Sequence, residues 1–405
     1  DTDYYMALVS YKKGKTDEAA NYLRTYISRK GANKLFDAHY LLAEIYISAG
    51  DLKKAEREVN ILVNTYTKYT NVDRILFSFA RNMYEKKITA AQTYFNILQN
   101  RFPESDYSSM VYLLHGNSYF QSGNYEKAVL NYEKYLNSNA AENRGGAFYN
   151  LLQSNFRLKK YNRVIEIISS VKIPLLDEEQ WKEIPLIQAR SYYNLKNYEQ
   201  VYNLLRWENF LVFSNDDVKM LVESTIKTGD IRTVLAIIEQ LSNQESLQRE
   251  MQLLLADYYE ENKNYDDAKN IYNLILISGA SEPVKEKARI SLAEIFAESG
   301  NYELSINLLN QVELKDNVAE RDCLIIINHF YSGQEKKGAE ITDSRLSFIL
   351  NTRFTEKVLL LNMVYHYNQK NVRAFNLYVK YLNPYKNNID YINYLSGKLS
   401  FETGA

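Results

Sequence analysis

The chain has 405 residues, of which 46% are hydrophobic and 24% are charged, an ordinary composition for a globular protein. No stretch approaches the ~18 consecutive apolar residues of a membrane-spanning helix. The 49 Lys and Arg residues nearly balance the 50 Asp and Glu residues, so no global basic field attracts a nucleic-acid backbone. We therefore expect neither a membrane span in this segment nor a nucleic-acid partner.

Cysteine is almost absent and tyrosine is abundant, with 1 and 36 residues. Cys323 cannot form an internal disulfide and precedes an apolar run, 324–326, so we expect it to be buried. The tyrosines have two interpretations: they fill helix interfaces while their hydroxyls stay hydrated, or they line a recognition groove. Residues 1–3 have no feature of a signal peptide, so we expect either a cytoplasmic protein or a processed or trimmed form.

A pattern of two amphipathic helices joined by a short turn recurs along the whole chain. Its clearest copy is residues 110–136, with a turn at 122–124. The second helix of each copy is predicted to begin at Thr16, Leu52, Ile88, Tyr125, Tyr161, Tyr198, Ile231, Tyr265, Tyr302, Glu335 and Val372, which are 33 to 37 positions apart. At the turns, glycine and asparagine tolerate the left-handed conformation that ends a helix, and Asp or Asn caps the next helix. The pattern predicts an all-α fold of eleven helical pairs and part of a twelfth.

Small and aromatic residues hold fixed places in the copy at 110–136. Tyr112, Gly116 and Tyr119 lie on its first helix, and Ala128 and Tyr132 lie on its second. A small residue lets two helices cross closely, and an aromatic ring fills the space beside the crossing. Through these residues the unit resembles the tetratricopeptide repeat. Tyr112 occupies the position at which this family prefers tryptophan. The resemblance implies a right-handed α-α superhelical solenoid that extends over residues 1–405 without a separate second domain.

In some repeats, larger residues replace the small residues at which the two helices cross. We therefore expect the solenoid to contain regular and degenerate subsections. Valine replaces the alanine of the second helix at Val164, Val201 and Val234. We expect regular repeats over 1–140 and 246–315, and degenerate repeats over 141–245 and 316–405.

Three breaks interrupt the pattern, at 138–143, Ile173–Pro174 and 210–217. Each is too short for the flexible linker of a two-domain enzyme. Residues 390–401 are predicted to form one more first helix, with Gly404 in the turn place. Because terminal repeats normally have a polar capping helix, we expect the native polypeptide to continue beyond Ala405.

The sequence shows no motif of a catalytic or metal-binding site. Glycine-rich phosphate loops, HExxH helices, GxSxG elbows and paired-cysteine metal spacings do not occur. The histidines occupy separate repeats and are assigned to packing: His39, His115, His329 and His366. We therefore predict no enzyme activity, no cofactor and no metal, and an enzyme stays open only if the chain lacks a catalytic part of a longer protein.

The resemblance implies that the first helix of each repeat lines a concave groove that binds protein or peptide partners. In this alignment the middle of the groove presents Phe120, Gln121, Tyr149, Gln153, Phe156, Arg157, Arg190 and Tyr193. Aromatic rings provide contact area, and the glutamines and arginines suit peptide carbonyls and carboxylates. The alternative is a groove that is merely hydrated, with its rings used for packing.

Further along, the same alignment predicts an acidic wall suited to a basic partner, formed by Glu250, Asp257, Glu260, Glu261, Glu294 and Glu298. The alternative is that these charges are solvated helix faces. The lysine and asparagine with which tetratricopeptide co-chaperones grip chaperone tails are not reproduced. Only Lys219 fits the lysine place, and its companion is Glu223.

Residues 94–105, together with the clear repeat that follows them, resemble short sequence segments of bacterial envelope tetratricopeptide proteins. The resulting hypothesis is a non-catalytic interaction scaffold in a bacterial envelope or periplasmic assembly, such as a flagellar one. The alternative is a cytoplasmic regulatory or sensor module that controls an effector attached to it. The sequence favours the periplasm over the cytoplasm and leaves the oligomeric state open.

Overall fold

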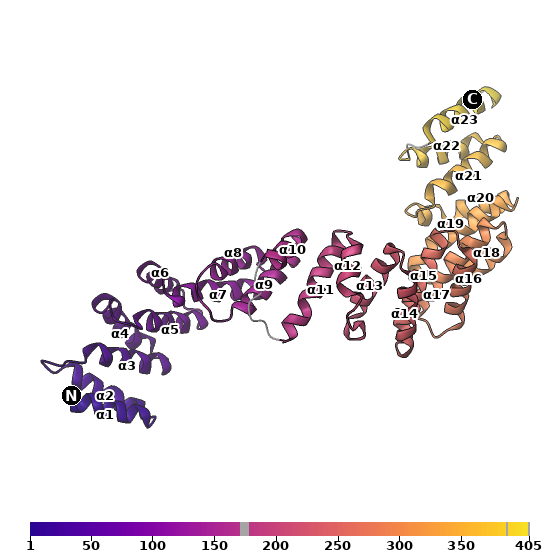
Figure 1. The fold of residues 1–405 in the computed structure, drawn as a ribbon. Coiled ribbons are helices and arrows are strands. Elements are labelled where there is room, and N and C mark those ends of the chain that lie inside the picture. Colours follow the sequence, from indigo (N-terminus) through magenta and orange to yellow (C-terminus); the bar gives the residue numbers. More distant parts are fainter. Residues whose placement is uncertain (171–177, 386–387, 404–405) are drawn as a thin grey trace. The chain divides into compact units, whose positions relative to one another are not determined.

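The computed structural model describes residues 1–170, 178–385 and 388–403, and every regular element among them is a helix (Figure 1). The prediction of an all-α solenoid of helical pairs is confirmed. Clustering of contacts divides the chain into two compact units, unit 1 (Asp1–Asn197) and unit 2 (Tyr198–Ala405). We call the first helix of each pair the A helix and the second the B helix.

Unit 1 contains six A helices and five B helices. Its A helices are α1 (Thr2–Lys12), α3 (Leu35–Ser48), α5 (Val72–Glu85), α7 (Asp106–Gln121), α9 (Arg144–Arg157) and α11 (Glu178–Asn194). Its B helices are α2 (Thr16–Ile27), α4 (Leu52–Thr65), α6 (Ala91–Arg101), α8 (Tyr125–Leu136) and α10 (Tyr161–Ser170).

Unit 2 begins with a B helix and continues the alternation. Its B helices are α12 (Tyr198–Leu205), α14 (Ile231–Gln240), α16 (Tyr265–Ile277), α18 (Tyr302–Leu309), α20 (Glu335–Ile349) and α22 (Val372–Leu382). Its A helices are α13 (Asn215–Thr228), α15 (Glu245–Glu261), α17 (Glu282–Glu298), α19 (Lys315–Tyr331), α21 (Thr355–Asn368) and α23 (Ile389–Thr403). Two short 3-10 turns, η1 (Phe210–Val212) and η2 (Leu241–Asn243), lie in its connections.

All the predicted start residues of the B helices begin a helix except Ile88. There α6 begins three residues later, at Ala91. Lys87 has a positive φ of 57°, and the N–H of Ala91 donates to the carbonyl of Ile88 at 3.1 Å. The chain therefore completes one additional turn before it enters this helix.

The turns inside the repeats use lysine where we expected asparagine. The left-handed residue is a glycine at six turns, such as Gly123 (φ 76°), and a lysine at five turns, such as Lys159 (φ 58°) and Lys263 (φ 60°). The expectation that asparagine takes this place is wrong at these turns. At three of these turns asparagine follows the lysine instead, as Asn197, Asn264 and Asn371. Asparagine also follows Gly123, where the side chain of Asn124 accepts the N–H of Lys127 and so caps the B helix.

The A helices of neighbouring repeats contact one another within each unit, and each B helix packs against A helices. In unit 1, α3 contacts α5, α5 contacts α7, and α7 contacts α9; in unit 2, α15, α17, α19 and α21 continue in the same way. The predicted close crossing is present in the repeat of α7 and α8, where a Cβ at Gly116 would lie 2.8 Å from Cε1 of the buried Tyr132. The contacts between A helices thus join successive repeats within each unit.

Two of the three predicted breaks lie in the described residues. Residues 138–143 connect α8 and α9, whereas the break at 210–217 is shorter than expected. There η1 is helical, and Ser214 starts α13 because its hydroxyl accepts the N–H of Asp217. The predicted Ile173–Pro174 corner and the Gly404 turn lie outside the described residues.

The predicted final A helix is present as α23. The division into regular and degenerate subsections stays a prediction. In the part of the chain that the structure describes, no helix combines the length and the apolarity that crossing a bilayer requires.

Candidate functional site

Tyr149, Gln153 and Arg190, which belong to the predicted groove set, lie close together in unit 1. The amide of Gln153 donates to the hydroxyl of Tyr149 at 3.0 Å, and this hydroxyl donates to Oε2 of Glu183 on α11 at 3.1 Å. Burial raises the pKa of Tyr149, while the Gln153 hydrogen bond and the charge of Arg190 oppose the rise. The arrangement links the A helices α9 and α11 through a polar contact.

The two predicted groove phenylalanines pack within their own repeats. The ring of Phe120 meets that of Tyr125 edge-on at 5.7 Å between centroids, and Phe156 meets Tyr161 at 5.5 Å. In each case the last turn of an A helix contacts the first residue of its B helix. This geometry favours the packing interpretation for both rings. The remaining three predicted residues lie at the ends of A helices, with Gln121 and Arg157 exposed and Tyr193 half-buried.

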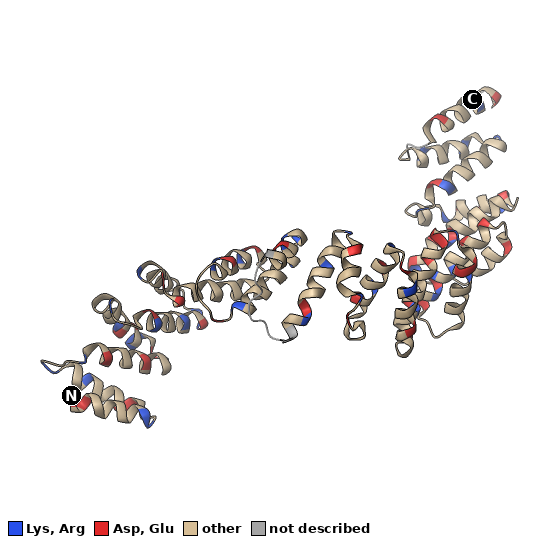
Figure 2. Ribbon diagram, viewed as in Figure 1, with Lys and Arg blue, Asp and Glu red and all other residues tan. Residues whose placement is uncertain are grey.

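Most of the predicted acidic wall is assembled in unit 2, whose acidic residues are marked in Figure 2. Glu260 on α15 lies close enough to Asp257 on the same helix, and to Glu294 and Glu298 on α17, for their charges to interact. Burial raises the pKa of Asp257 and of Glu260. Burial also raises the pKa of Glu294 to about 7, and the charge of Glu260 adds to this rise. The wall is therefore a set of mutually repelling, partly desolvated carboxyl groups.

Tyr272 of the B helix α16 connects two of these carboxyl groups. Its hydroxyl lies 2.8 Å from Oδ1 of Asp257 and 2.6 Å from Oε2 of Glu260. A hydroxyl has one proton to donate, so the two carboxylates compete for it unless one of them is protonated. The fully buried Tyr272 thus holds Asp257 and Glu260 in place from the B helix.

Arg353 is a cation that the sequence analysis did not predict in this wall. It lies in the connection before α21 and pairs with Glu294 on α17 and with Glu320 on α19, where its Nε is 2.6 Å from Oε1. The charge of Arg353 lowers the pKa of Glu294, against the larger effect of burial. Glu320 is likewise an additional member of the wall. The helical pattern places Glu320 on an A helix, but Arg353 lies in a connection that this pattern does not describe.

The other predicted wall residues lie at its edges. Glu298 accepts the hydroxyl of Tyr265 at 2.6 Å, and Glu261 lies 3.7 Å from Nζ of Lys227. Glu250 lies on α15, about two turns before Asp257.

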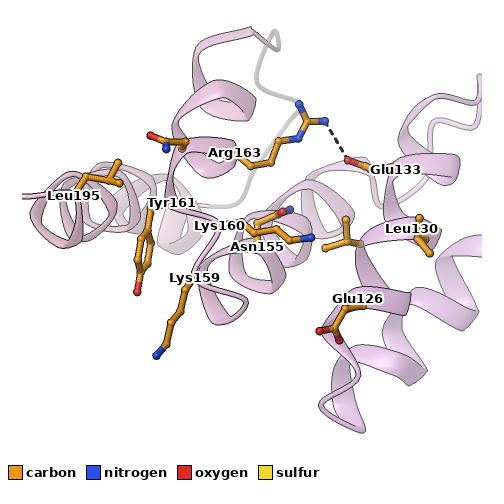
Figure 3. Close-up of a pocket in the computed structure, with 11 residues that line it drawn as sticks. Glu126, Leu130, Glu133, Asn155, Lys159, Lys160, Tyr161, Arg163 and Leu195 are labelled. Atoms are coloured by element: carbon orange, nitrogen blue, oxygen red, sulfur yellow. Dashed lines mark hydrogen bonds and ion pairs between the residues drawn. The ribbon is translucent and has the colours of Figure 1, made fainter.

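A separate hollow of about 680 Å³ lies beside the α9–α10 turn in unit 1 (Figure 3). Leu130 on α8, with 58% of its surface exposed, and Leu195 line it together with Lys159 and Lys160. At its rim, Nη2 of Arg163 lies 3.1 Å from Oε1 of Glu133. The lining residues differ from the predicted groove set, and the helical pattern of the sequence did not single them out. The hollow is open and of mixed polarity, which suits contact with a protein side chain better than enclosure of a small molecule.

The histidines and the cysteine pack into helix interfaces. Nδ1 of His39 lies 2.6 Å from Oε2 of Glu58, and the ring of His366 stacks on Tyr378. Burial lowers the pKa of His115, whose ring meets Phe95 edge-on. Cys323 is fully buried, as expected. Among the described residues, no group of three or more His, Cys, Asp or Glu side chains has an arrangement that could hold a metal ion.

Two family models bear on this architecture. One model described as a tetratricopeptide repeat matches residues 10–76, and another with the same description matches residues 111–142. These two stretches contain tetratricopeptide repeats. Members of this family are generally non-catalytic modules that bind other proteins, which is the functional class the A-helix groove fits. No curated protein matches the sequence significantly.

Several solved tetratricopeptide-repeat structures are similar at low sequence identity. A structure titled Naa15/Naa10 bound to HypK-THB is 11% identical, with a TM-score of 0.39, covering 100% of this chain and 73% of the other. Yeast Tom70 is 11% identical, with a TM-score of 0.38 and coverages of 94% and 98%. The C-terminal part of a repeat protein from Cytophaga hutchinsonii is 15% identical, with a TM-score of 0.34 and coverages of 71% and 99%. These low TM-scores carry no conclusion about this chain.

Proposed function

We propose that this tetratricopeptide-repeat protein is a non-catalytic scaffold whose unit 2 binds a basic segment of a partner protein along α15, α17 and α19. The observation that carries the proposal is the imbalance of charge in the acidic wall. Glu260, Glu294 and Glu320 interact with one guanidinium, that of Arg353, and the nearby cation of Asp257 is Lys287. The four carboxyl groups thus outnumber the two cations.

The physical reason is that partly desolvated carboxylates repel one another. A lysine or arginine from a partner supplies the missing countercharge, and the field of the wall accelerates encounter with a basic segment. An extended or helical peptide can place such side chains along successive A helices, because α15 contacts α17 and α17 contacts α19.

Peptide binding to the full chain tests this function. A fluorescent peptide of alternating Arg and Ala should bind, binding should weaken as salt is raised, and an alternating Glu and Ala peptide should not bind. The variant Glu260→Gln/Glu294→Gln should bind the basic peptide about tenfold more weakly at pH ~8. The matched control Glu239→Gln/Glu303→Gln removes two exposed carboxylates from the B helices α14 and α18 and should leave affinity within about twofold. Equal weakening by both pairs would contradict a site at the wall.

We propose the middle groove of unit 1 as a second partner-binding surface. The supporting observation is the polar contact of Tyr149 with Gln153 and Glu183, which presents a fixed hydroxyl between two A helices. The double variant Phe156→Ala/Tyr193→Ala tests two further residues of the predicted groove set. Recovery of the same partners from the native cell with this double variant would argue against the surface.

For the cellular setting, we propose a bacterial envelope or periplasmic assembly, on the support of the similarity at residues 94–105. The alternative is a cytoplasmic module that controls an attached effector. Fractionation of the native cell separates the two, because recovery with the cytoplasmic proteins would contradict the envelope proposal.

A further inference from the structure

Arg353 links three successive repeats of unit 2 through one side chain. It precedes α21, and its guanidinium contacts Glu294 and Glu320, which lie 59 and 33 residues earlier in the chain. These partners belong to α17 and α19, the two preceding A helices. Arg353 therefore enters the acidic wall from outside the repeats that form it.

The connection that contains Arg353 is held in place by its neighbours. Thr352 Oγ1 lies 3.2 Å from Sγ of the buried Cys323, and the Thr355 hydroxyl donates to the carbonyl of Ile349 at 2.6 Å. The guanidinium carbon lies 4.5 Å from the ring centroid of Phe354, a cation–π distance. The backbone is thus positioned to direct the guanidinium at the wall.

The exposed side chain can nevertheless leave the wall without opening the core. The side chain of Arg353 is 61% exposed, whereas its partners Glu294 and Glu320 are 21% and 31% exposed. Rotation of the arginine would free two partly buried carboxylates and give up the contact with the Phe354 ring, without opening the buried core. The carboxylates stay fixed on helices while the cation is the movable member.

We propose that Arg353 is an autoinhibitory contact: it occupies the place that an arginine or lysine of the basic partner takes, and it must leave when the partner binds. This inference rests on the proposed function of the wall. The internal guanidinium and the incoming one use the same charge-assisted hydrogen bonds to Glu294 and Glu320. Because the two are exclusive, the apparent affinity for a basic segment is reduced by the fraction of molecules in which Arg353 is bound.

Arg353→Gln tests the inference in the full chain. The variant should bind the alternating Arg and Ala peptide about three- to tenfold more tightly than wild type at pH ~8. Lys336→Gln is the matched control, because Lys336 is an exposed cation of unit 2 that pairs with Glu340 on the B helix α20. It removes the same charge and should change affinity less than twofold. Arg353→Lys, which loses the forked geometry but keeps the charge, should give an intermediate gain.

The outcomes separate the inference from the function on which it rests. If wild type binds the peptide and Arg353→Gln binds equally or more weakly, or if Lys336→Gln gives the same gain, the autoinhibitory contact is overturned and the basic-partner site stands. If neither wild type nor Arg353→Gln binds while circular dichroism shows both folded, the proposed function fails and the inference fails with it. If Arg353→Gln does not fold, Arg353→Lys decides, because unchanged or weaker binding by that variant overturns the contact. If the gain in peptide affinity that Arg353→Gln produces disappears in the double variant Arg353→Gln/Glu294→Gln, competition at Glu294 is supported.

Discussion

The hydroxyl of Tyr272 lies 2.8 Å from Oδ1 of Asp257, and the same relationship recurs in unit 1, where the hydroxyl of Tyr132 lies 2.9 Å from Oδ1 of Asn117. Each pair is separated by 15 residues, and each tyrosine is fully buried on a B helix. The tyrosine therefore reaches between the two helices of its repeat and holds a side chain at the groove. In unit 2 that side chain is a carboxyl group of the acidic wall.

Tyr272→Phe should destabilise unit 2 more than Tyr132→Phe destabilises unit 1. Removal of the Tyr272 hydroxyl leaves the desolvated Asp257 and Glu260 without their shared donor, at a cost of about 2–3 kcal/mol. The half-buried Asn117 can turn to water instead, so the loss at Tyr132 should be about 1 kcal/mol. Urea unfolding followed by circular dichroism measures both. Equal losses would show that the carboxyl groups do not depend on the hydroxyl.

Gly116→Ala should destabilise unit 1 by about 1–3 kcal/mol, because the new methyl group would meet the buried ring of Tyr132 at 2.8 Å. Gly146→Ala is the control in the same unit. Nothing lies within 4 Å of a Cβ there, so the better helix propensity of alanine should stabilise α9 by about 0.5–1 kcal/mol. Opposite shifts in the melting temperature of the two variants are expected. A stabilised Gly116→Ala protein would refute the close crossing of α7 and α8.

Lys159→Gly should stabilise the α9–α10 turn by about 0.5 kcal/mol. Lys159 has φ 58°, a conformation that strains residues with a Cβ and that glycine adopts freely. Gly123→Ala at the equivalent turn, φ 76°, should cost about 1 kcal/mol for the same reason, since the space around it is open. Thermal unfolding of both variants checks the sign. A less stable Lys159→Gly protein would mean that the lysine side chain outweighs the backbone strain.

The stability of unit 2 should fall as the pH rises from about 4.5 to 7. The pKa of Glu294 is raised from an ordinary 4.5 to about 7 in the folded chain. Between these values the folded state keeps a proton that the unfolded state has released, so stability declines with increasing pH, by on the order of 1–3 kcal/mol. Below pH ~4.5 both states are protonated and this contribution is fully present.

Glu294→Gln should remove that part of the pH dependence, whereas Glu239→Gln, at an exposed place on α14, should retain it. Urea unfolding at several pH values measures the difference in the free energy of unfolding. A variant with the wild-type slope would show that Glu294 titrates normally.

The sequence was sufficient for the helices and for part of the wall because both follow from local regularity. The turn chemistry predicted the first residue of α8 and α16, and the same alignment predicted that Asp257, Glu260 and Glu294 share one face. The 15-residue offset that joins Tyr272 to Asp257 was also available in the sequence.

The rest depends on features that periodicity does not encode. The path of the connection before α21, which brings Arg353 to Glu294, is set by Thr352, Phe354 and the packing of α19. Whether Phe120 faces the groove or packs on Tyr125 depends on its rotamer, which the spacing of residues cannot predict. Lysine in the left-handed place was missed because residue preference favours glycine and asparagine there.

Mapping where a basic segment lands tests the central claim most directly. An alternating Arg and Ala peptide that carries one photoreactive residue would be crosslinked to the full chain, and the attachment points identified by mass spectrometry. The proposed function predicts crosslinks on α15, α17 and α19, within residues 245–331, that decrease with Glu260→Gln/Glu294→Gln. The autoinhibitory contact predicts in addition that they increase with Arg353→Gln. Crosslinks confined to residues 1–197, or unaffected by Glu260→Gln/Glu294→Gln, would contradict the proposed function.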